Sequence, residues 1–332
     1  MSIRVMRPGL LTSIQDLGRY GFQQHGVIVS GAMDALSLRV ANLLVGNEEK
    51  EAVLEMTLVG PSISFEEDSL IAITGGDLSP NINGNPVSGW RPIFVKKGSI
   101  LKFGPCKEGC RTYLALAGGY DIPKKMNSKS TYLLGGIGGF NGRALKAGDV
   151  LASGSMSEKS NRLFNQLKLK QKESPFATTG WFVNRKEFLP LRKSPVIRVM
   201  NGRQFDLFKR SSCSEFFTLP FKVSSQSDRM GYRIAGPKIE LNEKVEMISE
   251  AVTHGTIQIP PDGNPIILLA DRQTTGGYPK IGQVVSVDLP LIAQTKPGEE
   301  IYFSNITHEE AEQLYLERER KLKALEAVIS LN

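Results

Sequence analysis

Cysteine and histidine are both scarce in this sequence, with three residues of each among 332. The odd and sparse cysteine count is typical of reduced thiols in the cytoplasm rather than of a disulfide-bonded secreted protein. Cys106 and Cys110 have a loose metal-binding spacing, but no second pair follows and the histidines are scattered. These absences argue against a structural zinc site, and we expect no metal on this chain.

Long apolar runs are missing as well. No stretch approaches the roughly 18 apolar residues that span a membrane, and the N-terminal sequence MSIRVMRPGLL has no apolar core of signal-peptide length. We therefore expect a cytoplasmic protein. Apolar residues make up 40% of the chain and charged residues 23%, which is ordinary for a globular protein of about two domains.

Nucleotide-binding motifs are also absent, although glycine is abundant. The glycine-rich segment STYLLGGIGGFNGR fails the GxGxxG pattern because Asn141 stands where the third glycine belongs. It fails the GxxxxGK[ST] pattern because it contains no Gly-Lys pair. Gly138 and Gly139 are therefore interpreted either as part of a nest of backbone N–H groups or as part of a tight β loop.

Short apolar runs alternate with turn residues over most of the chain. Between residues 52 and 151 turn signals recur about every ten residues, a spacing typical of a β-barrel or sandwich. Similar runs resume at residue 196. A helix is expected within residues 30–47, where apolar residues repeat at helical spacing, with Ser30 or Asp34 as its cap. Thr307 and Glu310 predict a capping box, so the last helix is expected to begin after Thr307. It either packs on its own domain or docks a partner.

The two halves of the sequence contain similar segments in the same order, which indicates an internal duplication. The segment QDLGRYGF resembles QSDRMGYR, which makes Arg19 and Arg229 equivalent. Two further pairs of segments match in the same order: Gly60–Gly76 with Gly236–Val252, and Gly98–Gly119 with Gly255–Gly277. We therefore predict two related β-barrel domains, residues 1–152 and 195–306, with a ligand cleft between them.

Residues 153–194 interrupt the strand pattern. Between positions 158 and 172 a single acidic residue, Glu158, accompanies five basic ones: Lys159, Arg162, Lys168, Lys170 and Lys172. A basic patch is one feature of nucleic-acid-binding proteins, but here a single aromatic residue, Phe164, lies among the basic ones and no known module pattern is present. We therefore interpret residues 153–194 as a solvated linker between the domains, with one short helix expected near Leu163–Leu169. Residues 307–332 complete the chain as the C-terminal helix.

Residues 266–284 carry the densest group of candidate binding residues. The apolar run Ile266–Ala270 predicts a short buried strand. Polar side chains follow it directly: Asp271, Arg272, Gln273, Thr274 and Thr275. Gly276 and Gly277 then permit a sharp turn or the close approach of a ligand. Polar groups at a strand end are common in binding sites, although a polar loop with a structural Asp–Arg pair produces the same pattern.

The charged residues near these motifs indicate which ligands the chain could bind. The cationic side chains suit a carboxylate or a phosphate: Arg19, Arg229, Arg272 and Lys280. The aspartates suit a base or an acceptor for an amide N–H: Asp16, Asp228 and Asp271. His254 is either a proton carrier or a structural histidine. No catalytic triad follows from spacing, so these residues favour anion and amide binding without naming a reaction.

Five segments resemble the biotin-dependent carboxyltransferase family, which is also called allophanate hydrolase subunit 2. They are SIQDLGRYGFQQHGVIVSGAMD, LEMTLVGP, STYLLGGIGGFNGR, SDRMGYRIAGP and DGNPIILLADRQTTGGYPKIG. The resemblance covers residues 3–305. It implies a mainly β chain with two related cyclophilin-like β-barrels, which agrees with the duplication, besides a few short helices and the C-terminal helix.

Stand-alone chains of this length within the family resemble the C subunit of ATP-dependent 5-oxoprolinases. The implied reaction opens the lactam of 5-oxo-L-proline to L-glutamate with ATP hydrolysis. The implied partners are two further proteins of the complex, one KipI-like and the other LamB/YcsF-like. ATP, with Mg²⁺, is expected to bind at the level of the complex, and biotin is not expected on this chain.

The residues and the resemblance together define the expected site. The residues expected to act in catalysis are charged: Asp16, Arg229, Asp271 and Arg272. The residues expected to bind substrate are Arg19, Gly138, Gly139, His254, Gln273, Thr274, Thr275, Tyr278 and Lys280.

The resemblance leaves two other functions open. One is carboxyl transfer from carboxybiotin to an amide or urea-like substrate, for which biotin would have to come from another protein. The other is regulation, because the family includes antagonists of a KipI-like inhibitor of a histidine kinase in spore-forming bacteria. No nucleic-acid or membrane partner is expected.

Overall fold

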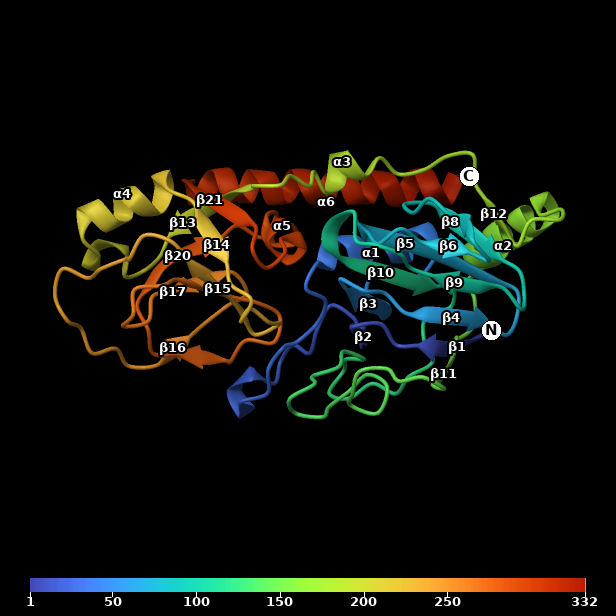
Figure 1. Ribbon diagram of the computed structural model, residues 1–332, viewed down its shortest axis with the longest axis horizontal. Coiled ribbons are helices and arrows are strands. Elements are labelled where there is room, and N and C mark those ends of the chain that lie inside the picture. Colours follow the sequence, from blue (N-terminus) through green and yellow to red (C-terminus); the bar gives the residue numbers. More distant parts are fainter. Residues whose placement is uncertain (332) are drawn as a thin grey trace. The chain divides into compact units, whose positions relative to one another are not determined.

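The computed structural model describes residues 1–331 and contains two compact units (Figure 1). Unit 1 comprises Met1–Arg19, Asp34–Pro190 and the chain from Leu322 onward. Unit 2 comprises Tyr20–Met33 and Leu191–Lys321. Each unit is therefore assembled from segments that are far apart in the sequence, and a single cut in the chain does not separate them.

Unit 1 contains two six-stranded antiparallel sheets. The first has the order β11 (Val150–Ala152), β1 (Ser2–Arg7), β4 (Ser62–Phe65), β9 (Ile100–Lys102), β6 (Asn81–Ile82) and β7 (Asn85–Pro86). The second has the order β12 (Phe176–Thr178), β8 (Pro92–Val95), β5 (Ser69–Asp77), β10 (Glu108–Leu116), β3 (Val53–Thr57) and β2 (Leu11–Gln15). Apolar side chains from both sheets form one core, in which Ile63 of β4 and Ile71 of β5 are fully buried.

Helix α1 (Ala35–Leu44) covers the second sheet of unit 1, where it contacts β5 and β10. These strands are nearly continuous runs of buried residues, because each is enclosed on both faces. Asp34 begins the helix by accepting a hydrogen bond from the Ser37 backbone N–H at 2.9 Å, as an N-cap residue does. Gly46, with φ of +74°, follows its last turn.

Residues 153–190 carry regular structure in unit 1, where the composition predicts a linker. Helix α2 (Glu158–Lys170) buries Leu163 and Leu167, which lie one turn apart. Strand β12 pairs with β8 at the edge of the second sheet, and helix α3 (Arg185–Phe188) follows. The short helix expected near Leu163–Leu169 is confirmed as part of the longer α2. The polar composition gives no sign of β12, because backbone hydrogen bonds hold this strand.

Unit 2 is built around a closed barrel with the strand order β13-β20-β17-β18-β15-β14-β21. The strands are β13 (Val196–Asn201), β14 (Phe221–Val223), β15 (Gly231–Ala235), β17 (Thr256–Gln258), β18 (Ile266–Leu268), β20 (Lys280–Val284) and β21 (Glu300–Asn305). Strands β13 and β21 pair in parallel, whereas the other pairs are antiparallel. Met33, from the first segment of the unit, lies in the barrel core.

Short elements surround the barrel. They are the 3₁₀ helices η1 (Gln23–His25) and η2 (Phe205–Leu207), the helices α4 (Arg210–Thr218) and α5 (Leu289–Gln294), and a two-stranded ribbon of β16 (Glu250–Ala251) and β19 (Thr275–Gly276). The proposed duplication is incomplete here. Residues 60–76 hold β4 and β5, but their counterparts, residues 236–252, hold only β16 and run mostly exposed without regular structure.

The last helix, α6, spans His308–Leu331. Thr307 and Glu310 form the predicted capping box, because the Thr307 backbone N–H donates to Glu310 Oε2 at 2.9 Å and the Glu310 N–H donates to Thr307 Oγ1 at 3.2 Å. A mainly β chain with a closed barrel, few helices and a C-terminal helix is thus confirmed. Within residues 1–331 no helix is both long enough and apolar enough to cross a membrane.

A buried network ties residue Asp16 to the loop that follows β10. Asp16 Oδ1 accepts hydrogen bonds from Gly18 N and Ser128 Oγ, both at 2.8 Å, and Oδ2 accepts one from Lys129 N at 2.6 Å. Arg19 is fully buried and donates to the carbonyl oxygens of Lys125 and Ser130. Asp16 and Arg19 therefore fix the loop in place rather than face a ligand.

The glycine-rich loop packs onto the same segment. A Cβ atom at Gly138 would overlap Ser130 O, and one at Gly139 would overlap Thr131 Oγ1. Both glycines have positive φ, +71° and +53°, and the Gly139 N–H donates to Lys129 O at 2.9 Å. Glycine at positions 138 and 139 therefore allows this loop to pack closely against Ser130 and Thr131.

We expect Gly139→Ala to destabilise the protein more than Gly136→Ala. Both residues have positive φ, but a Cβ at Gly136 meets nothing within 4 Å. The control should cost about 1–2 kcal/mol of unfolding free energy from backbone strain alone, and Gly139→Ala a further 1–3 kcal/mol or so from overpacking. Urea unfolding measures both. Equal losses would show that Thr131 moves aside at little cost.

Candidate functional site

Asp271 and Arg229 form a buried ion pair at the end of β18. Arg229 Nε donates to Asp271 Oδ2 at 2.9 Å and Nη2 donates to Oδ1 at 3.0 Å, so the pair is bidentate. Each side chain is only 6% exposed. The Asp271 N–H also donates to the Arg229 carbonyl at 2.8 Å, which continues the backbone pairing of β15 and β18 beyond the last residue of β18.

Two residues from the first segment of unit 2 complete this pair. Ser30 Oγ donates to Asp271 Oδ1 at 2.7 Å, and Arg229 Nη2 donates to the Gly31 carbonyl at 2.6 Å. Paired carboxylate and guanidinium groups with further hydrogen bonds can be held in a protein interior, where a lone charge cannot. Asp271 and Arg229, which the sequence analysis places among the catalytic residues, are thus engaged with each other in this structure.

Arg272, the next residue, is arranged differently. Its Nη1 donates to the Leu269 carbonyl at 3.3 Å, and its Nε is enclosed without a hydrogen-bond partner among residues 1–331. It forms no ion pair in that part of the chain, neither with Asp271 nor with Glu250. Burial lowers the pKa of the Arg272 guanidinium, against the opposite influence of Tyr20. A half-buried cation without a carboxylate is suited to binding an anion.

His254 lies close enough to this cation to be affected by it. Part of the residue is exposed, but its ring Nε2 is enclosed and has no partner among residues 1–331. Burial, with the nearby charges of Arg272 and Arg229, lowers the pKa of His254 from 6.5 to about 3. The imidazole is therefore neutral near pH 7. It lines a cavity of about 330 Å³ together with Gln283 and Tyr315.

Lys280 belongs to a second polar group at the start of β20. Its Nζ donates to Glu250 Oε2 at 3.1 Å, and Gln204 Nε2 donates to the same oxygen at 3.3 Å. The bond from Lys280 lowers the pKa of the Glu250 carboxyl. Gly276, between these elements, lies so close to the Gln258 side chain that a Cβ atom would overlap it. Lys280 is therefore paired, and a side chain at position 276 would require the Gln258 side chain to move.

The remaining predicted binding residues form the accessible part of the strand end. Gln273 and Thr275 are exposed, Thr274 and Gly277 are partly buried, and Tyr278 is 42% exposed. The Thr274 carbonyl accepts the Val252 N–H at 3.1 Å, which anchors the segment beside β16. Their hydroxyl and amide groups can hydrogen-bond to an amide or a carboxylate.

The sequence did not identify several residues that shape this site. Ser30, Gly31 and Gln204 each hold one of the charged side chains, and Tyr20 lies near Arg272. Ser30 and Gly31 do carry one signal in the sequence, because Ser-Gly is a dipeptide typical of turns. The structure agrees, since both residues have positive φ, +56° and +99°. The strand end of unit 2 thus offers one available cation, a neutral imidazole and exposed hydrogen-bonding groups.

Residues 25–305 match the family described as carboxyltransferase domain, subdomain A and B. The chain belongs to this carboxyltransferase family. The resemblance carried by the sequence motifs is thereby confirmed.

Three members or relatives of the carboxyltransferase family show how far the similarity extends. The 5-oxoprolinase C subunit of Haemophilus influenzae is 36% identical over 321 residues, which cover 96% of this chain and 95% of that protein. The protein of the same name from Escherichia coli is 37% identical over 324 residues, which cover 97% of each chain. The crystal structure of K. lactis urea amidolyase superposes with a TM-score of 0.85 and 33% identity over 98% of this chain but only 20% of the amidolyase.

We expect Arg229→Ala to destabilise the protein strongly, because it leaves the buried Asp271 carboxylate without its cation. Breaking a buried pair of this kind costs about 3–5 kcal/mol of unfolding free energy. Arg203→Ala is the control, since Arg203 is 81% exposed and pairs with Glu250 at 3.5 Å; exposed pairs contribute about 0–1 kcal/mol. Chemical unfolding of both variants measures the difference, and similar stabilities would show that the Asp271 pair is not structural.

His254 should make the protein less stable as the pH falls. Its pKa is 6.5 in the unfolded chain and about 3 in the native state, so between these values the unfolded state binds more protons. Native stability is then lost as the pH falls from 6.5 toward 3, by at most about 1.4 kcal/mol per pH unit. His254→Gln should flatten this dependence in thermal unfolding scans between pH 7 and pH 4.

The exposed His25 provides the control for this measurement. His25→Gln should leave the acid dependence as in the wild type. If His254→Gln instead shifts the whole curve without changing its slope, the histidine takes up its proton as easily in the native state as in the unfolded chain.

Proposed function

We propose that this chain is the C subunit of an ATP-dependent 5-oxoprolinase, which acts with a KipI-like protein and a LamB/YcsF-like protein. The complex would convert 5-oxo-L-proline to L-glutamate with hydrolysis of ATP, in the cytoplasm. The observation that carries the proposal is the near-complete mutual coverage between this chain and two proteins that bear the name of this 5-oxoprolinase component. The strand-end site of unit 2 supports it chemically.

The substrate has a carboxylate and a lactam, and the strand end has groups for both. Arg272 is a cation at this strand end that pairs with no carboxylate within residues 1–331, so it would bind the substrate carboxylate. Gln273 and Thr274, beside it, would hydrogen-bond the lactam N–H and carbonyl. His254 stays neutral near pH 7, which leaves one ring nitrogen to accept a hydrogen bond while the other donates.

An unstrained lactam is a poor electrophile, and phosphorylation of its carbonyl oxygen by ATP supplies a leaving group. A first water then attacks the same carbon and the C–N bond opens, which frees the amine and leaves an acyl phosphate. A second water hydrolyses this acyl phosphate to the carboxylate of glutamate and releases phosphate. Within residues 1–331 no cluster of three His, Cys, Asp or Glu side chains is placed to hold a metal ion. We therefore assign the binding of ATP and Mg²⁺ to the assembled complex and derive no step through them on this chain.

The central test is reconstitution. The purified chain should be inactive alone and should form glutamate from 5-oxo-L-proline when mixed with the KipI-like protein, the LamB/YcsF-like protein and ATP. Omitting any one component should abolish the product. Turnover by the isolated chain, or no turnover by the complete mixture, would contradict the proposal.

A second function, carboxyl transfer to a urea-like substrate, is favoured by the similarity to K. lactis urea amidolyase over 98% of this chain. In that case biotin would be supplied by another protein. Mass analysis of the complex purified from cells would then reveal a biotinylated partner, and urea with carboxybiotin would be consumed. A complex without biotin that forms glutamate supports the first proposal instead.

We expect Arg272→Ala to reduce the activity of the reconstituted complex while the chain stays folded. Loss of a charge-assisted contact to a carboxylate weakens binding by about 1.5–3 kcal/mol, or roughly 10- to 150-fold. Because Arg272 forms no ion pair within residues 1–331, the melting temperature should stay within a few degrees. Arg192→Ala, at an exposed position, is the control. Full activity of Arg272→Ala would exclude Arg272 from the site.

A further inference from the structure

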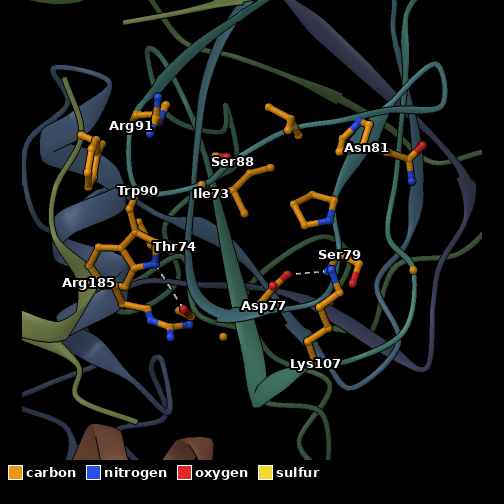
Figure 2. A pocket seen from close by; sticks show the side chains of 18 of the residues that line it. Ile73, Thr74, Asp77, Ser79, Asn81, Ser88, Trp90, Arg91, Lys107 and Arg185 are labelled. Carbon is orange, nitrogen blue, oxygen red and sulfur yellow. Dashed lines mark hydrogen bonds between the residues drawn. The ribbon is translucent and has the colours of Figure 1, made fainter. Parts of the chain in front are cut away.

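Unit 1 contains a cavity of about 790 Å³ that the lactam chemistry does not use. It lies where β5 ends, between the loop that precedes β8 and the turn that precedes β10, and residues 182–185 border it (Figure 2). This volume is within the usual range of small-ligand pockets. Figure 2 shows side chains from these separate segments around one space, with Arg91 and Asp77 well apart in it.

The backbone at this cavity is held in an uncommon conformation. Trp90 has φ of +59°, which is rare for a bulky residue and is maintained only where the surroundings impose it. Its backbone N–H donates to the Ile73 carbonyl at 2.7 Å and its indole Nε1 to the Gly75 carbonyl at 3.3 Å. A Cβ at Gly89 would lie 2.6 Å from the same Ile73 oxygen. Trp90 thus forms a fixed wall whose only side-chain donor is already engaged.

Arg91 supplies an unneutralised positive charge at the cavity. Its guanidinium lies 4.9 Å from the centre of the Phe182 ring, which is 60% exposed. Its Nε is enclosed and has no hydrogen-bond partner among residues 1–331, and the side chain forms no ion pair in that part of the chain. A guanidinium stacked on an aromatic ring keeps its donor edge free for a carboxylate. The Arg91 environment therefore favours an anion.

The opposite side of the cavity presents an acceptor. Asp77 Oδ1 accepts the Ser79 N–H at 2.7 Å, whereas its other carboxylate oxygen accepts no hydrogen bond within residues 1–331. Two cations also border the cavity: Lys107, which is exposed, and Arg185, which pairs with Glu108. These positive charges disfavour a second cation beside Asp77. A neutral N–H donor fits the position better than an ammonium group does.

Apolar side chains fill the remaining wall between these polar groups. Ile73, Val87 and Trp90 are buried and line the cavity. A ligand that matches all three features carries a carboxylate for Arg91, an amide N–H for Asp77 and an apolar body. We propose that this cavity binds a small N-acylated amino acid with an apolar side chain. None of its residues takes part in the proposed lactam chemistry, so the two proposals are tested independently.

The chain contains two tryptophans, Trp90 and Trp181, which allows a direct optical test. In the variant Trp181→Phe the fluorescence arises from Trp90 alone, at the cavity wall. The probe is N-acetyl-L-leucine, which has the carboxylate, the amide N–H and the apolar side chain. We expect a saturable change in emission and saturable heat in titration calorimetry. N-acetyl-L-leucinamide, which lacks the carboxylate, and L-leucine, which has an ammonium group, should bind at least tenfold more weakly.

Arg91→Gln in the same background should raise the dissociation constant for N-acetyl-L-leucine about tenfold or more. The control is Arg162→Gln, because Arg162 is exposed on α2 and does not line the cavity. Thermal unfolding verifies that each variant is folded. The proposal is overturned if N-acetyl-L-leucine gives neither saturable fluorescence nor heat, if the leucinamide binds equally well, or if folded Arg91→Gln retains the wild-type affinity.

Discussion

The buried pair of Asp271 and Arg229 is the interaction on which the architecture of unit 2 depends. It joins the end of β18 to the residues before β15, and Ser30 and Gly31 attach the first segment of the unit to it. Because both charges are satisfied internally, the neighbouring Arg272 is left as the cation available at this strand end. One ion pair thus distinguishes Arg229, which is engaged with Asp271, from Arg272, the arginine that we propose binds substrate.

The different surroundings of Arg229 and Arg272 show what the sequence can and cannot predict. The strand at residues 266–268, the cap at Asp34 and the capping box at Thr307 were predictable, because their signals lie within a few adjacent residues. The partner of Asp271 was not, because Arg229 and Arg272 carry the same chemistry and only the pairing of β15 with β18 decides between them. Local patterns specify elements, whereas contacts between them assign the roles of the charges.

The same limit applies to unit 1. Polar groups among glycines are common at binding loops, which is why the sequence pattern suggests a site at Asp16, Arg19, Gly138 and Gly139. In the structure all four residues instead contact the same segment, residues 129–131. In residues 153–190 the leucines of α2 predict a short helix, whereas the edge strand β12, which is held by backbone hydrogen bonds, leaves little trace in a polar composition. The cavity beside Trp90 had no sequence signal, because four separate segments form it.

The membership of residues 20–33 in unit 2 has a consequence for how the chain folds during synthesis. The hydrogen bond from Ser30 to Asp271 joins positions 241 residues apart, and Met33 lies in a core whose other members come from residues 197 onward. Contacts of such long sequence separation form late and slow folding. During synthesis residues 20–33 therefore cannot form these contacts until residues 197–303 of the barrel core have left the ribosome.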